Sequence, residues 1–152
     1  MQWSIGGRSL ATAATANHVG AQLWNPSTTE GIWVTAISLF QTAAVVSNPS
    51  IKRSSARGAT PTATVTPDIN SDWSRNVSPP SAAVLELATF GTQPTLAGVP
   101  LLSSNLPAAI ASGFMLPFAG RGLYIPSAQG LCVYTPVAVI LQPFDITFFI
   151  EE

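Results

Sequence analysis

The sequence predicts an all-β protein, a single antiparallel β-sandwich that is jelly-roll-like and carries an N-terminal arm. Three observations support this prediction. The 152 residues suffice for one domain. Thirteen prolines and eleven glycines leave little room for helices of ordinary length. The runs between them are short and rich in β-branched and aromatic residues, as strands are, and eight or so such strands fit a sandwich, a barrel or a jelly roll. We therefore expect less than about 15% helix, against a usual share of about a third.

The clearest strand is Gly31–Gln41, in which apolar residues occupy both alternating faces. This pattern predicts a central strand that is buried on both sides. The last run, Val137–Ile150, exceeds one typical strand, and Pro143 predicts a bend or an edge position within it. The other expected strands are Val19–Trp24, Ser50–Ser55, Ala83–Phe90, Gly113–Phe118, Leu123–Ile125 and Leu131–Thr135.

Two internal segments do not read as strands. Thr60–Pro80 is polar and rich in proline, which predicts a long ordered loop with one helical turn near Asp68–Trp73. Leu101–Ala111 permits a single short helix that begins with Pro107 at its first position.

The N-terminal residues 1–20 are expected to form an arm, and residues 21–152 the sandwich domain. The segment Ala11–Ala16 contains only alanine and threonine, which supply little volume for a core but can lie along a neighbouring molecule. The start of the chain also has no basic region followed by a long apolar run, so we expect no signal peptide.

Charge is scarce in this chain. Six Lys and Arg and seven Asp and Glu amount to 9% of the residues, where an average domain has about 25%. A net charge of −1 argues against nucleic acid as a partner, and no apolar run is long enough for a transmembrane helix. A surface with so few charges favours self-association, and we expect a homotrimer. The long uncharged stretches, Leu87–Gly120 and Gly122–Phe144, are the parts expected against neighbours.

The residue inventory favours a protein that is not an enzyme, with no cofactor and no metal. His18 is the only histidine and no nucleophile motif accompanies it, so a surface or turn position is expected. Cys132 lies within a strand, which predicts a buried, unreactive thiol and, with no partner cysteine, synthesis in a reducing cytoplasm. Asp68, Asn70 and Asp72 have the spacing of a calcium loop, but Trp73 replaces its required glycine.

Lys52, Arg53 and Arg57 form the one basic cluster of the sequence. In a strand Arg53 and Arg57 face one way and Lys52 the other. The cluster is either a charged edge that prevents strand pairing or a contact with an acidic partner surface. We take these three residues, together with Trp73, as candidate partner contacts.

Several short motifs occur in an order that resembles small virion proteins of tailed bacteriophages. They are Lys52–Pro61, Thr64–Asp68, Pro80–Leu85, Gln93–Leu96, Leu106–Ile110 and Gly122–Pro126, with Gly130–Leu131 closing a hairpin. The resemblance covers roughly residues 30–150. It implies a β-sandwich that decorates or cements a capsid, commonly as a trimer. The chain has Pro126-Ser127-Ala128-Gln129-Gly130 where those proteins usually have a second glycine, and Gly130 is expected to supply the positive φ of the turn.

The expected function is therefore that of a structural virion protein, made in the bacterial cytoplasm, which binds the major capsid protein on the outer capsid surface and stabilises it. The alternative is a receptor- or carbohydrate-binding module of a fibre or tail, in which exposed tryptophans stack on sugar rings. The candidates for that role are Trp3, Trp24, Trp33 and Trp73. A hydrolase is disfavoured by the residue inventory.

Overall fold

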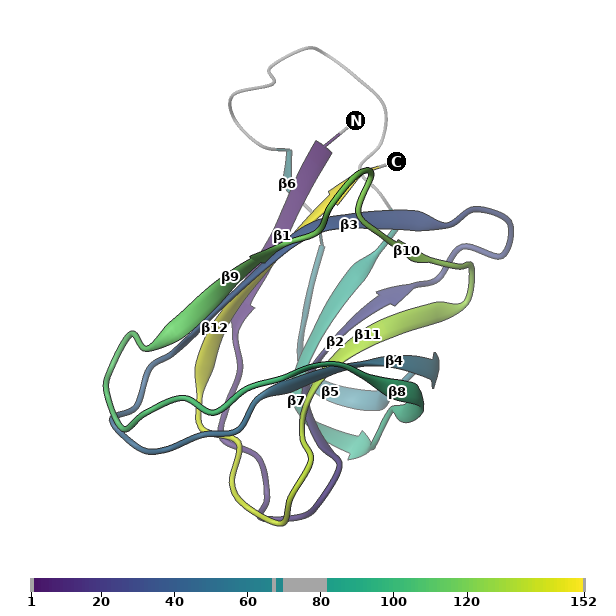
Figure 1. Cartoon of the computed structure of the whole chain (residues 1–152). Helices are drawn as coiled ribbons and strands as arrows, with labels where there is room; N and C mark the ends of the chain where they lie inside the picture. The colour runs from purple at the N-terminus through teal and green to yellow at the C-terminus, as the bar shows by residue number, and fades with distance from the viewer. Residues whose placement is uncertain (1, 67, 70–81, 152) are drawn as a thin grey trace.

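The computed structural model describes residues 2–66, 68–69 and 82–151, and no helix occurs among them. The predicted all-β fold is confirmed (Figure 1). The strands are β1 (Gln2–Arg8), β2 (His18–Asn25), β3 (Ile32–Gln41), β4 (Ser50–Ala56), β5 (Ala59–Val65), β6 (Asp68–Ile69), β7 (Val84–Thr92), β8 (Thr95–Ser103), β9 (Gly113–Pro117), β10 (Leu123–Ile125), β11 (Gln129–Thr135) and β12 (Phe144–Glu151).

The strands form two antiparallel six-stranded sheets that pack face to face (Figure 1). The first sheet has the order β10-β3-β12-β1-β6, with β9 also paired to β3, and the second has the order β5-β7-β2-β11-β4-β8. Since β9 and β10 pair with successive parts of β3, they act as one interrupted edge strand. The main core lies between the sheets, where side chains such as Leu23, Leu39, Leu131 and Phe148 are fully buried.

The pairing order is that of a jelly roll. If β5, β6 and β7 are left out and β9 and β10 are counted as one strand, eight strands remain. Numbered 1 to 8 in chain order, they have the order 1-8-3-6 in the first sheet and 2-7-4-5 in the second. These are the two interleaved Greek keys that define the jelly-roll sandwich. The jelly-roll prediction is therefore confirmed, with β5–β7 as an insertion between the fourth and fifth strands.

The expectation that β3 is buried on both faces is wrong, because the strand contains a bulge. Phe149 and Ile150 pair with Ala36 and Val34, so Thr35 is an extra residue in the ladder. A bulge reverses which residues face inward beyond it. The core therefore receives Ile32 and Val34 before the bulge and Ile37, Leu39 and Gln41 after it, while the other face is only partly buried.

The expectation of an N-terminal arm over residues 1–20 is also wrong. β1 lies inside the first sheet, between β12 and β6, and pairs with β12 along its whole length. Trp3 and Ile5 belong to the main core, and residues 18–20 begin β2. The alanine-rich segment is the loop between β1 and β2, where Thr12 bonds to the backbone of Leu141.

The insertion curls the second sheet around a second, smaller core. β4 continues into β5 and β7 into β8 after connections of two residues each, so the four strands form one long antiparallel ribbon. Its two ends pair with opposite sides of the β2–β11 pair, because β7 joins β2 and β4 joins β11. The ribbon and this pair enclose the second core: Val19, Ala88, Phe90, Cys132 and Tyr134, with Leu96 packed against them.

Three local expectations are corrected. Residues 60–65 of the segment expected as a loop belong to strand β5, and Asp68–Ile69, where a helical turn was expected to begin, form β6. Residues 67 and 70–80 of that segment lie outside the described part of the chain. Residues 101–111 contain the end of β8 and a turn rather than a helix. β10 and β11 do not form a hairpin, because they belong to different sheets, and the positive φ between them occurs at Ala128 instead of Gly130.

Candidate interaction surface

No group of three His, Cys, Asp or Glu that could hold a metal ion occurs among the described residues. Cys132 is buried in the second core, as predicted, and burial raises the pKa of its thiol to about 12. His18 begins β2, where its imidazole Nε2 lies 3.1 Å from the Gln93 side-chain amide.

The structure does not bring the three basic residues together. Arg53 reaches the first sheet, where its Nη1 donates to the Tyr124 carbonyl at 2.8 Å, and Lys52 leaves β4 on the opposite side. Arg57 binds the buried Glu86 carboxylate at 2.7 Å. The expectation that Arg53 and Arg57 share one face is wrong, because the β4–β8 ladder shifts register between Ser54 and Ala56.

The tryptophans are mostly unavailable for stacking. Trp3 and Trp24 are buried, and among the described tryptophans only Trp33 is partly exposed. Trp73, the fourth candidate partner contact, lies outside the described residues. So do Asn70 and Asp72 of the calcium-like spacing.

Four loops meet at one end of the sandwich, which we call the loop end. They are residues 9–17, 42–49, 104–112 and 136–143, which join β1 to β2, β3 to β4, β8 to β9 and β11 to β12. A jelly roll brings these connections to the same end, because its successive strands alternate in direction and every second connection therefore lies at the same end. In Figure 1 they lie at the bottom and lower left.

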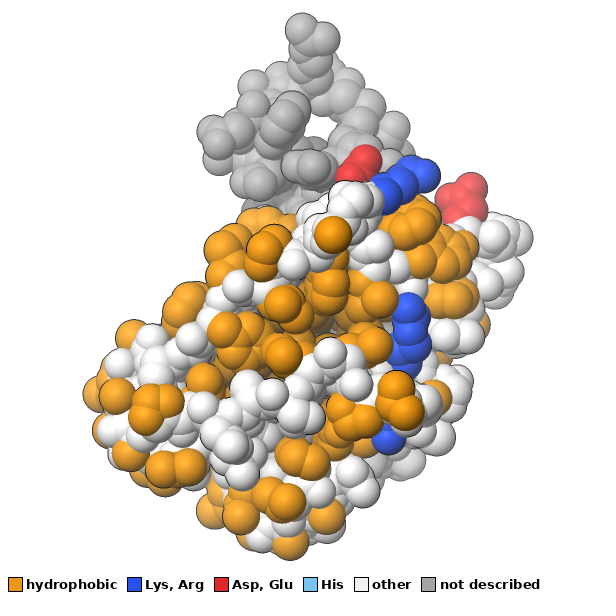
Figure 2. All heavy atoms as spheres, in the orientation of Figure 1, with side chains coloured by type: hydrophobic (Ala, Val, Ile, Leu, Met, Phe, Trp, Pro, Cys, Tyr) orange, Lys and Arg blue, Asp and Glu red, His pale blue; other side chains and the backbone are white. Residues whose placement is uncertain are grey.

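The loop end contains no charged residue, although its apolar side chains are exposed. Figure 2 shows orange and white atoms there, without blue or red. Val46 is 60% exposed and Ile110 is 70% exposed. The exposed large apolar residues of these loops are Leu10, Val45, Val46, Ile110, Val137, Val139 and Ile140.

Hydrogen bonds tie the four loops to one another. Thr12 N–H donates to the Leu141 carbonyl at 3.0 Å, and Leu141 N–H donates to Thr12 Oγ1 at 3.1 Å. Gln142 N–H donates to Ser47 Oγ, and Ser47 and Leu106 exchange two backbone hydrogen bonds. The loops therefore hold a fixed shape, which lowers the conformational entropy lost when a partner binds.

An ion pair borders the loop end. Arg8, the last residue of β1, donates from Nε and Nη2 to the two carboxylate oxygens of Asp145 at 2.7 and 2.8 Å. The Arg8 hydrogen bond holds the pKa of Asp145 below its usual value. Beside this pair is a surface hollow of about 290 Å³, which is lined by Arg8, Phe40, Gln41, Thr42, Ile110, Ala111 and Asp145.

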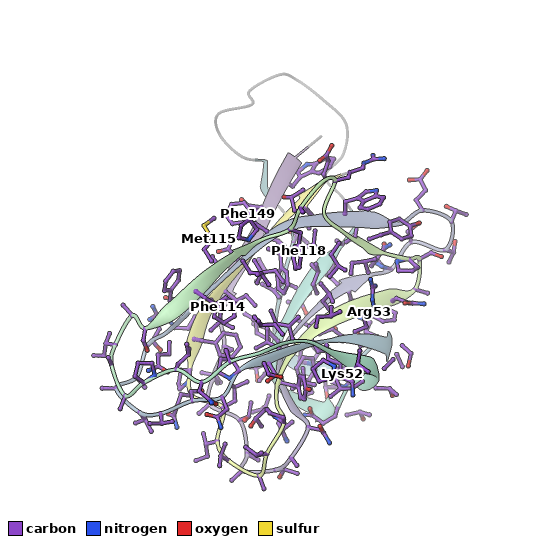
Figure 3. All side chains as sticks on the ribbon, viewed as in Figure 1. Lys52, Arg53, Phe114, Met115, Phe118 and Phe149 are labelled. Atoms are coloured by element: carbon purple, nitrogen blue, oxygen red, sulfur yellow. The ribbon has the colours of Figure 1, made fainter. Side chains whose placement is uncertain are left out.

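A second apolar surface, which we call the open side, lies between the edge strands β8 and β9. Figure 2 shows apolar side chains gathered in a depression there. Phe114 of β9 and Phe118, the residue after that strand, pack against the main core, while Met115 lies on the opposite face of β9 (Figure 3). Leu102 and Leu123 complete the lining from β8 and β10. Pro100 and Pro117 lie in the two edge strands and hinder the pairing of another strand there.

Comparison of the chain with protein-family models, with curated protein sequences and with solved structures found no match. In the part of the chain that is described, no helix is long and apolar enough to cross a membrane.

The loop end was not predicted from the sequence, although part of its signal is visible there. Two of the four loops fall within the uncharged stretches already singled out, Leu87–Gly120 and Gly122–Phe144. The other two, residues 9–17 and 42–49, lie in the uncharged stretches 9–29 and 31–51, whose interface role was not predicted. Only the jelly-roll pairing order shows that all four form one surface.

Proposed function

We propose that this protein is a structural virion protein that attaches to the outer surface of a phage capsid, with the loop end against the major capsid protein. In this role it stabilises the capsid by bridging neighbouring subunits, so that their separation also requires breaking its contacts. The order of motifs that resembles small phage virion proteins supports the same assignment.

The observation that carries the proposal is the uncharged, preorganised apolar surface of the loop end. The buried centre of a protein interface is depleted of charged residues, and charges lie at its rim. The loop end matches this distribution, because its loops are apolar and the Arg8–Asp145 pair stands at its border. Loops held on a rigid sandwich are also the usual place for binding surfaces.

We further propose that the protein acts as a homotrimer whose copies meet at the open side. The Phe114 and Phe118 rings are only partly covered within one chain, and a neighbour would remove more of their surface from water. Three linked copies would also strengthen attachment to the capsid without a strong individual site. Light scattering should then give about three times the 15.8 kDa mass of the chain.

The test is reattachment of the purified protein to capsids that lack it. Introducing Val46→Asp, Ile110→Asp and Val139→Asp together would place three carboxylates within the loop end. We expect this variant to lose attachment, because each buried carboxylate would have no partner. The matched control is Thr28→Asp, Thr29→Asp and Ser55→Asp together, since these three side chains are also exposed and lie outside both the loop end and the open side.

The salt dependence and the stability of the particle distinguish the apolar contact from an ionic one. An apolar contact predicts attachment that changes little with salt, and capsids that burst at a lower temperature without the protein. Steep release by salt, with loss of binding when Lys52, Arg53 and Arg57 are replaced by Ser, would instead assign the contact to the basic residues. Equal burst temperatures with and without the protein would contradict the stabilising role.

A further inference from the structure

A row of side chains crosses the outer face of the first sheet away from the loop end. Tyr124 of β10, Trp33 of β3 and Glu151 of β12 are direct partners on neighbouring strands. The Tyr124 and Trp33 ring centroids are 4.9 Å apart with the planes inclined at 50°. The Tyr124 ring also lies against Gly31, where any Cβ would collide with it. Tyr124 is thus held in place while remaining 42% exposed.

Two arginines flank this aromatic pair. The Arg121 guanidinium lies over the Trp33 ring, 5.1 Å from its centroid, and Arg53 donates to the Tyr124 carbonyl. The ion pairs among the described residues are Arg8–Asp145 and Arg57–Glu86, so neither flanking arginine has a carboxylate partner there. In Figure 2 an apolar patch accordingly lies between two blue groups at the right of the molecule.

The combination of groups suits a sugar ring. The C–H face of a pyranose is apolar and packs on an aromatic ring, while its hydroxyls both donate and accept hydrogen bonds. Arg121 and Arg53 offer only donors, and the Glu151 carboxylate offers only acceptors. A nucleic acid would also stack on Tyr124, but its phosphates would be repelled by Glu151, and the chain has too few cations to compensate.

We propose that Tyr124, Trp33 and Glu151, with Arg121 and Arg53, form a binding site for a pyranose unit of a surface polysaccharide. Tyr124 provides the stacking surface, Trp33 positions both Tyr124 and Arg121, and the charged groups bind hydroxyls. The row crosses β3 at Trp33, next to the N-terminal end of the strand, whereas the loop end begins after Gln41 at its other end. The site therefore stays accessible when the loop end is covered, and it does not depend on the capsid proposal.

The test is binding of the purified protein to an array of bacterial surface polysaccharides, followed by calorimetry with fragments of those that bind. We expect binding that falls at least tenfold in Tyr124→Ala and Arg121→Gln but is retained in Tyr124→Phe, which keeps the ring. The matched control is Met115→Ala, because Met115 is 61% exposed on the same outer face and lies outside the row.

Thermal melts of all variants should coincide, since the substituted side chains are exposed and their loss leaves the core intact. Absence of binding to every polysaccharide on the array would overturn the proposal. So would binding that survives Tyr124→Ala, or binding that Met115→Ala reduces to the same extent. Selective binding to single-stranded DNA offered on the same array would reassign the aromatic pair to nucleic acid.

Discussion

At the scale of single residues, the second core explains polar side chains that a sequence alone cannot interpret. Gln22 is fully buried, and the ribbon satisfies both ends of its side-chain amide. The amide donates to Ser54 Oγ at 2.8 Å and accepts from Gly58 N–H at 2.9 Å. Glu86 is equally buried because Arg57 covers it. Both residues occupy strand positions that read as solvent-facing in the sequence. They are buried only because the ribbon curls over this face of the second sheet.

The Arg57–Glu86 pair gives a first prediction. Arg57→Gln should lower the free energy of unfolding by about 2 kcal/mol, because it leaves a buried carboxylate without its charged partner. This is less than for a fully buried pair, since the Arg57 side chain is 44% exposed. The double variant Arg57→Gln, Glu86→Gln should recover much of the loss. Urea unfolding measures both, and a double variant less stable than Arg57→Gln would contradict this explanation.

The Cys132 thiol gives a second prediction. Because burial raises its pKa to about 12, the thiol stays protonated and covered at pH 8. An aromatic disulfide reagent should therefore label the native protein very slowly and the unfolded protein at once, with one equivalent per chain. Rapid labelling of the native protein would show that the second core opens readily.

At the scale of elements, the sequence predicted most strands of both sheets, including β9 and β10, but missed β1, β5 and β8. Runs such as 19–24 and 131–135 are confirmed as parts of β2 and β11, because their alternating apolar residues face the main core. β5 and β8 were missed, since their prolines and glycines resemble loop signals although edge strands tolerate them. The bulge at Thr35 is likewise absent from the pattern, because it depends on pairing with β12.

β1 provides the third prediction, which is the sharpest contrast with the expected arm. Ile5→Ala should cost about 2–5 kcal/mol of unfolding free energy, because it opens a cavity in the main core. The matched variant Leu10→Ala, at a side chain 51% exposed in the next loop, should change it by less than about 0.5 kcal/mol. Thermal or urea unfolding compares the two. Equal, small changes in the unfolding free energy of the two variants would show that β1 adds little to the stability of the fold, as expected of an arm.

At the scale of the whole molecule, the fold class was predictable but the interaction surface was not. Proline and glycine spacing and short alternating runs indicated an all-β sandwich, barrel or jelly roll, and the resemblance to small virion proteins implied the sandwich. The loop end depends on four segments that are far apart in the chain and come together only through the pairing of β1, β3 and β12 in one sheet and β2, β11 and β4 in the other. The scarcity of charge indicated a surface of this kind without locating it.

A reconstruction of the virion that carries the chain shows whether the uncharged loop end attaches this protein to a capsid. We expect density for the sandwich on the outer capsid surface, with residues 9–17, 42–49, 104–112 and 136–143 against the major capsid protein. The row of Tyr124, Trp33 and Glu151 should then lie away from that contact. A sandwich attached through any other face, or absent from the capsid, would rule out attachment by the loop end.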